Sequence, residues 1–178
     1  MCDNFFIITG GPGSGKTALI EELNRRGFFS IEEVARKIIQ DEMALGGDAL
    51  PGNNIGSRIE KMIVRSIETY QDALKKRTET TIFDRGVLDY MGYAYRTNTP
   101  ISEKLQHIAL SLAYNKKVFI APPWKEIYCH DTERKQSFEE ALEVYDNLFK
   151  IYSTYKYDII ELPKASVESR ADFAITHF

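Results

Sequence analysis

A chain of 178 residues can build one substantial hydrophobic core, and we expect a single domain over residues 1–178. Apolar residues make up 43% and charged residues 28%, and a net charge of −3 without a long basic run argues against duplex nucleic acid as the main partner. The two cysteines, Cys2 and Cys129, predict no disulfide framework and fit a reducing cytoplasm, and no apolar run approaches the roughly 20 residues that a transmembrane helix requires.

Strands and helices are predicted to alternate along the chain, because short apolar runs separate segments with helical periodicity. The expected strands are 4–9, 28–31, 80–84, 117–121 and 157–162. The expected helices are 18–26, 32–45, 55–77, 86–95, one introduced by Pro100 and Ser102, one from the capping box at Ser137 to about Tyr152, and 166–177. Leu74 and Ile108 are expected on the inward faces of their helices. This order predicts an α/β fold with a mainly parallel sheet and helices on both of its faces.

A phosphate-binding loop is predicted between the first strand and the first helix. Gly10-Gly11-Pro12-Gly13-Ser14-Gly15-Lys16-Thr17 matches the motif G-x-x-x-x-G-K-[ST] in full. The glycines let the backbone bend so that N–H groups point at phosphate oxygens, and the helix dipole adds to the attraction. We therefore expect residues 11–17 to bind a triphosphate, with Lys16 as a solvent-facing cation that reaches the β- and γ-phosphates and Thr17 as a ligand of Mg²⁺.

Polar residues follow the third strand, where ligands of parallel α/β sheets bind. Asp84 after the apolar strand has the Walker-B arrangement and is expected in the Mg²⁺ shell opposite Thr17. Arg85 would then face the phosphate-bearing crevice. The alternative is that Asp84 only caps the next helix and that Arg85 is a surface charge.

A second acidic position follows the second strand. Glu33 could accept a proton from an attacking hydroxyl or orient water, and Arg36, three residues later, could hold an anionic or polar substrate. The alternative is a capping box, in which Ser30 caps a helix and Glu33 reaches back to the backbone. The sequence leaves both interpretations open.

A charged segment precedes the Ser137 helix. Residues 131–136 include Arg134 and Lys135, either of which could close over the triphosphate from a lid at about 128–140 and stabilise charge at the γ-phosphoryl group. The alternative is an ordinary solvated approach to a helix.

The order of these motifs resembles the NadR-like AAA group of P-loop ATPases, relatives of nicotinamide riboside kinase and of the nucleoside and nucleotide kinases. The resemblance is carried by Gly10 to Thr17, Glu33-x-x-Arg36, Phe83-Asp84-Arg85-Gly86, Pro122-Pro123-Trp124-Lys125-Glu126-Ile127-Tyr128, Glu133-Arg134-Lys135-Gln136-Ser137-Phe138-Glu139-Glu140-Ala141 and the segment from Ser166 to Phe173. The block from Pro122 to Ala141 is its most particular part.

The resemblance implies a kinase-like P-loop fold with a five-stranded parallel sheet, in which the P-loop strand and the Asp84 strand are neighbours. It also implies that Arg134 belongs to a lid and binds the nucleotide. The chain lacks the adenylyltransferase domain of the bifunctional NAD-biosynthesis proteins, which weakens the expectation of a nicotinamide riboside kinase.

Two classes of function are expected. In the first, the chain is an ATP-dependent kinase of a small, nucleoside-like molecule: Lys16, Glu33, Asp84 and Arg134 are catalytic, Glu33, Arg36 and Arg85 face the substrate, and region 46–77 forms the acceptor pocket. In the second, it is a nucleotide switch or slow ATPase or GTPase that acts on a protein or lipid partner. The absence of an Asn/Thr-Lys-x-Asp guanine motif favours ATP over GTP.

Overall fold

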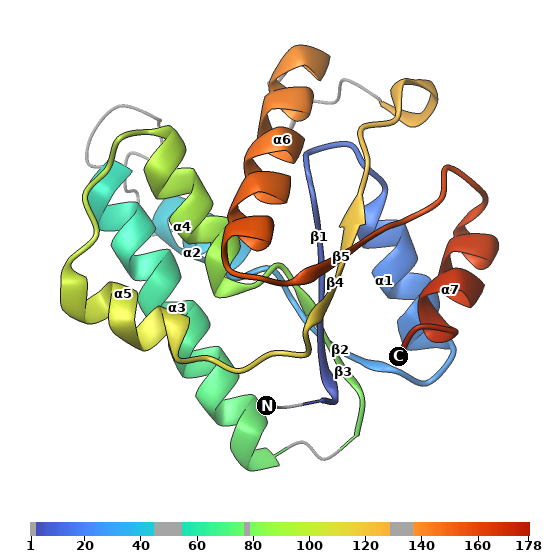
Figure 1. Cartoon of the computed structure of the whole chain (residues 1–178), viewed down its shortest axis with the longest axis horizontal. Helices are drawn as coiled ribbons and strands as arrows, with labels where there is room; N and C mark the ends of the chain where they lie inside the picture. The colour runs from blue at the N-terminus through green and yellow to red at the C-terminus, as the bar shows by residue number, and fades with distance from the viewer. Residues whose placement is uncertain (1–2, 45–54, 77–78, 129–136) are drawn as a thin grey trace.

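The computed structural model describes residues 3–44, 55–76, 79–128 and 137–178 (Figure 1). Its strands are β1 (Phe5–Gly10), β2 (Phe29–Ile31), β3 (Thr81–Asp84), β4 (Lys117–Ala121) and β5 (Asp158–Glu161). Its helices are α1 (Lys16–Arg25), α2 (Val34–Ala44), α3 (Ile55–Lys76), α4 (Val87–Arg96), α5 (Glu103–Leu110), α6 (Phe138–Thr154) and α7 (Val167–Ile175), with a 3₁₀ turn η1 (Lys125–Ile127) after β4. The predicted alternation of strands and helices is confirmed.

The five strands form one parallel sheet in the order β2-β3-β1-β4-β5. The P-loop strand β1 lies at its centre and pairs with β3, so that Ile8 stands opposite Asp84. This confirms the prediction that the P-loop strand and the Asp84 strand are neighbours. Because all strands run in one direction, their carboxyl ends lie along one edge of the sheet.

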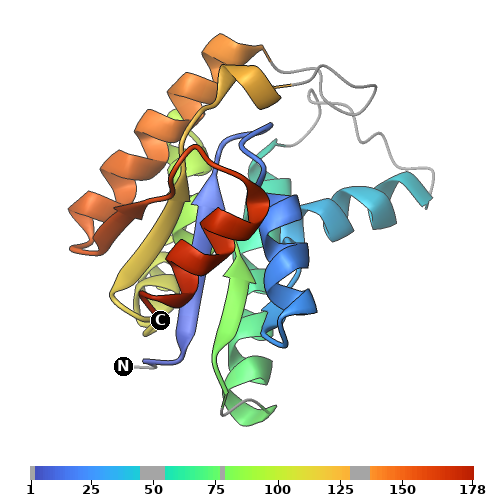
Figure 2. The same ribbon diagram turned by 90° about the vertical axis from the view of Figure 1, so that its right-hand side faces the viewer.

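The sheet buries a different helical layer on each face, and the alternation within β1 shows why. Phe5 and Ile7 point into a core shared with α3, α4 and α6, whereas Phe6 and Ile8 point into a core shared with α1 and α7. Figure 1 shows α3 and α4 to one side of the strands and α1 with α7 to the other, and Figure 2 shows α1 and α7 side by side. A strand that is apolar at successive positions is what burial on both faces requires.

The helix starts and faces follow from local sequence, with exceptions in α3 and α5. The predicted capping box opens α6: the backbone N–H of Ser137 donates to Glu140, and the N–H of Glu140 donates to the Ser137 hydroxyl. The expected inward positions of Leu74 and Ile108 are wrong, because these side chains are 53% and 36% exposed. Leu74 lies in the last turn of α3, and Ile108 lies in α5, a helix of only eight residues.

Within the described residues, no helix combines the length and the apolar character that crossing a membrane demands.

Candidate active site

The P-loop lies between the end of β1 at Gly10 and the start of α1 at Lys16. Gly13 and Gly15 have φ angles of 71° and 76°, in the left-handed region that side chains disfavour. The Ser14 hydroxyl donates to the Gly11 carbonyl at 2.8 Å and braces the turn. The loop therefore leads into α1 at the helix end whose N–H groups are free to bind an anion.

Two segments pack directly on the glycines of the loop. A Cβ atom at Gly13 would lie 2.5 Å from the Tyr128 ring, and one at Gly11 would lie 3.0 Å from the Ala141 carbonyl oxygen. Tyr128 follows η1, and Ala141 lies in the first turn of α6. Both belong to the block from Pro122 to Ala141, so two described positions of that block pack against the phosphate loop.

Lys16 is buried rather than solvent-facing, which corrects the expectation from the sequence. It is 7% exposed, and its Nζ lies 3.5 Å from Asp84 Oδ1 at the end of β3. Burial, together with the charge of Arg85, lowers the pKa of Lys16, and burial raises the pKa of Asp84. Both shifts favour the neutral forms, so the pair alone does not compensate for the desolvation of its charges.

Asp84 has the chemistry of a magnesium ligand. Its Oδ1 atom is buried and has no hydrogen-bond partner among the residues that the structure describes. Carboxylate and hydroxyl oxygens are ligands that Mg²⁺ accepts, and Thr17 stands exposed in the first turn of α1. Among the described residues no group of three or more acidic, histidine or cysteine side chains could hold a metal ion by itself. These residues fit an ion that is bound mainly through phosphate and water oxygens.

Arg85 is held between two carboxylates beside this pair. Its Nε donates to Glu33 Oε1 at 2.8 Å, and its Nη1 donates to Asp89 Oδ1 at 3.2 Å. Burial opposes the charge, but Glu33 and Asp89 outweigh it and raise the pKa of Arg85. The residue has a φ of 72°, which is strained for a side chain of this size, and its N–H donates to the Ile8 carbonyl of β1. The surface-charge alternative for Arg85 is therefore wrong.

The capping-box alternative for Glu33 is also wrong. Ser30 lies inside β2, and α2 begins only at Val34, so Ser30 does not cap that helix. Burial raises the pKa of Glu33, but the charges of Arg85 and Lys16 outweigh burial and place it below its ordinary value of 4.5. Glu33 is thus an ionised carboxylate at neutral pH, held at the site by an arginine.

Asp89 was not predicted, and it organises the site. Its carboxylate is 5% exposed and accepts hydrogen bonds from the Thr9 and Tyr152 hydroxyls, the Gly86 N–H and Arg85. It thereby ties β1, α4 and α6 to the Arg85 turn. The only sequence signal was its spacing, five residues after Asp84 and three after the glycine that precedes α4.

An Asp89→Asn variant is expected to lower the free energy of unfolding by about 2–4 kcal/mol, because the amide presents N–H groups to donors that had a charged acceptor. Urea denaturation of the purified protein measures this. Asp72→Asn is the matched control: Asp72 is 60% exposed in a surface ion pair with Lys75, and its loss should stay within about 0.5 kcal/mol. Equal urea midpoints for the wild type and Asp89→Asn would show that the Asp89 carboxylate does not stabilise the fold in this way.

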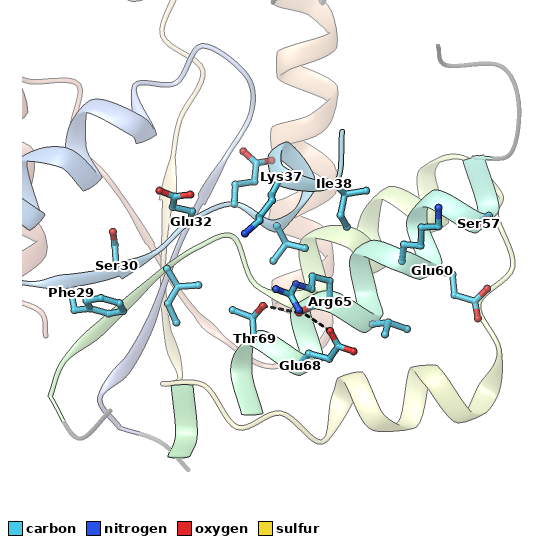
Figure 3. A pocket seen from close by; sticks show the side chains of 15 residues that line it. Phe29, Ser30, Glu32, Lys37, Ile38, Ser57, Glu60, Arg65, Glu68 and Thr69 are labelled. Carbon is cyan, nitrogen blue, oxygen red and sulfur yellow. Dashed lines mark hydrogen bonds and ion pairs between the residues drawn. The ribbon is translucent and has the colours of Figure 1, made fainter. Parts of the chain in front are cut away.

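A cavity of about 920 Å³ opens beside this cluster, between β2, α2 and α3. Figure 3 shows side chains from all three elements, among them Phe29, Lys37 and Glu60, around it. Glu33 also lines the cavity, and its carboxylate accepts the hydrogen bond from Arg85. Arg36 is exposed and is not among the lining residues, although its charge contributes to the lowered pKa of Glu33.

Some predicted features lie outside the described residues. These are Cys2, Cys129, the segment 131–136 with Arg134, and the part of the expected acceptor region that spans 46–54. The roles expected for them stay predictions.

The parallel sheet order, the glycine loop before α1 and the Lys16–Asp84 pair define a P-loop domain of the kinase-like type. The AAA domain family model matches residues 5–170, and the chain belongs to this family. Among curated proteins no sequence matches this chain.

Several solved structures share the fold. Deoxyadenosine kinase from M. mycoides with bound dATP is 15% identical with a TM-score of 0.60, and the match covers 97% of each chain. The NadR protein in complex with NR is 18% identical with a TM-score of 0.74, over 98% of this chain and 50% of that one. NadR in complex with NAD and AMP-PNP is 15% identical with a TM-score of 0.70, over 99% and 49%. This chain thus spans about half of the NadR chains, and identities this low establish the fold alone.

Proposed function

We propose that the protein is an ATP-dependent kinase of a small, nucleoside-like molecule. The observation that carries this proposal is the position of Glu33, which lines the cavity and contacts Arg85 next to the Lys16–Asp84 pair. A phosphate loop needs only Lys16 and the strand-end aspartate to bind a nucleotide. An acidic residue that also lines a separate cavity is what transfer to a second substrate requires.

In the proposed reaction the P-loop N–H groups and Lys16 bind the triphosphate, and the acceptor occupies the cavity with a hydroxyl directed at Glu33. The hydroxyl oxygen forms a bond to the γ-phosphorus as the bond from that phosphorus to the β,γ-bridging oxygen breaks. The hydroxyl proton passes to the Glu33 carboxylate, and ADP leaves. Arg85, fixed by Glu33 and Asp89, supplies positive charge beside the transferred group.

Thr17 and Asp84 would hold Mg²⁺, which neutralises phosphate charge when it is bound. The proposal keeps Arg134 as a nucleotide-binding and catalytic cation on the strength of the sequence motif, and Arg36 as a substrate residue at the exposed side of α2. It also keeps the cytoplasm as the place where the reaction occurs, because the two cysteines fit a reducing compartment.

Asp84→Asn is expected to weaken Mg·ATP binding at least tenfold while leaving ATP affinity in EDTA nearly unchanged, because the carboxylate acts through the metal shell. Calorimetric titrations with and without Mg²⁺ measure both. Asp158→Asn, at the start of β5, is a control that should change neither affinity. Equal losses in the two buffers would assign Asp84 a structural role.

A phosphate-transfer screen tests the proposal itself. Purified protein is incubated with γ-labelled ATP or GTP and a panel of nucleosides and vitamins, and labelled products are separated from the nucleotide. Transfer to at least one acceptor, preferentially from ATP, is the expected result. Slow hydrolysis without transfer to any member of the panel would count against the kinase and would favour the nucleotide switch.

A further inference from the structure

One buried arginine takes no part in the chemistry above. Arg170 lies in α7, is 2% exposed, and reaches the P-loop with its guanidinium group. Figures 1 and 2 show α7 beside α1. Both helices contribute to the core on the face of the sheet that Phe6 and Ile8 point into. A charged side chain this deeply buried has to find specific partners.

Its partners are two backbone carbonyls of the phosphate loop. Nη2 donates to the Ser14 carbonyl at 3.2 Å, and Nη1 donates to the Gly15 carbonyl at 3.3 Å. A Cβ atom at Gly15 would lie 2.6 Å from Nη1, so a glycine is needed there for the guanidinium to approach. Within the described part of the chain, Arg170 has no carboxylate partner, and its Nε has no hydrogen-bond partner.

These contacts fix which way two peptide groups face. The Ser14 carbonyl shares its peptide plane with the N–H of Gly15, and the Gly15 carbonyl shares its plane with the N–H of Lys16. The described residues contain no cis peptide bond, and in a trans peptide the C=O and N–H groups point in opposite directions. A guanidinium that holds both carbonyls on the α7 side therefore directs both N–H groups to the opposite side, toward the concave face of the loop.

We propose that Arg170 is a positioning residue that holds the P-loop in its anion-binding conformation, by fixing the peptide groups whose N–H donors are Gly15 and Lys16. This rests on the proposed binding of a triphosphate but not on the kinase acceptor. The guanidinium supplies two parallel donors in a rigid fork, which suits two adjacent carbonyls, whereas a lysine ammonium does not have that geometry. Its buried charge, which burial alone would disfavour, is further offset when an anion binds to the same loop.

The test compares Arg170→Met, Arg170→Lys and Arg26→Met by calorimetric titration with Mg·ATP and with inorganic tripolyphosphate. Arg26 is the matched control, because it also joins α1 to α7, through Asp172 and the Glu168 carbonyl, without touching the loop carbonyls. We expect Arg170→Met to bind both ligands about ten- to a hundredfold more weakly. Arg26→Met should have a lower melting temperature, but its affinities for Mg·ATP and tripolyphosphate should stay within about twofold of the wild-type values.

Wild-type affinity in a folded Arg170→Met protein would overturn the proposal, as would an equal loss in Arg26→Met, which would mean that the helix contact alone matters. If Arg170→Met does not fold, Arg170→Lys decides: reduced affinity for tripolyphosphate is expected, and undiminished affinity contradicts the idea. Amide NMR adds a direct reading, since tripolyphosphate should shift the Gly15 and Lys16 N–H signals in the wild type and less in Arg170→Lys. A wild type that binds neither ligand would refute the proposed function as well. If the wild type binds both ligands and Arg170→Met binds them equally well, only this inference is refuted.

Discussion

A Lys16→Met variant is expected to bind Mg·ATP at least about a hundredfold more weakly than the wild type, because the charged donor to the β- and γ-phosphates is lost. Methionine keeps most of the buried stem of the lysine. The fold should survive with a loss of about 2 kcal/mol or less, for two reasons. First, Asp84, whose pKa is already raised by burial, still has Arg85 as a nearby cation. Second, the loss of the Lys16 charge removes the repulsion between Lys16 and Arg85.

Calorimetry gives the affinity, and urea denaturation gives the stability, of the same preparations. Lys104→Met, an exposed position at the start of α5, is the control for loss of a lysine charge and should alter neither. Undiminished affinity of a folded Lys16→Met protein for Mg·ATP would refute the phosphate-loop assignment. A collapse of the fold would instead show that the Lys16–Asp84 pair stabilises the protein without ligand.

The fold could be predicted from the sequence because its signals are local. Apolar runs, helical periods and the capping box at Ser137 are read within a few residues, and their alternation defines a parallel sheet. The errors arose where burial depends on a distant neighbour. The period of α3 continues to Leu74 and that of α5 includes Ile108, but whether a helix end is covered depends on which elements lie beside it.

The site was predictable only in part, for the same reason. The loop, Lys16 and Asp84 form one motif, whereas the Arg85–Glu33 pair joins residues 52 positions apart. At Glu33 the sequence also fitted a local capping box with Ser30, but Glu33 instead forms an ion pair with Arg85. Ser30 cannot cap α2, because it lies in the edge strand β2. Asp89 and Arg170 looked like ordinary helix residues, since hydrogen bonds to Thr9, Tyr152 or the P-loop carbonyls leave no pattern in a single sequence.

A Glu33→Gln variant is expected to transfer phosphate to its acceptor about a hundred- to ten-thousandfold more slowly, with little change in ATP affinity. The amide keeps the size of the side chain but cannot accept the hydroxyl proton. The pH dependence supports the assignment with a defined sign. Because Arg85 and Lys16 lower the pKa of Glu33, its base form predominates at neutral pH, and protonation of Glu33 should slow the wild type only at a lower pH than an ordinary glutamate would require.

The experiment measures kcat and KM for both substrates with an acceptor from the transfer screen. Glu32→Gln is the matched control, because Glu32 also lines the cavity but is exposed, and its variant should keep kcat within about twofold. Loss of the Arg85 ion pair alone would have a different signature: Glu33→Gln would then lose stability and raise KM while kcat at saturation stayed near the wild-type value. Transfer by Glu33→Gln at the wild-type rate would show that Glu33 is not the base and only positions Arg85, and the proton would have to leave by another route.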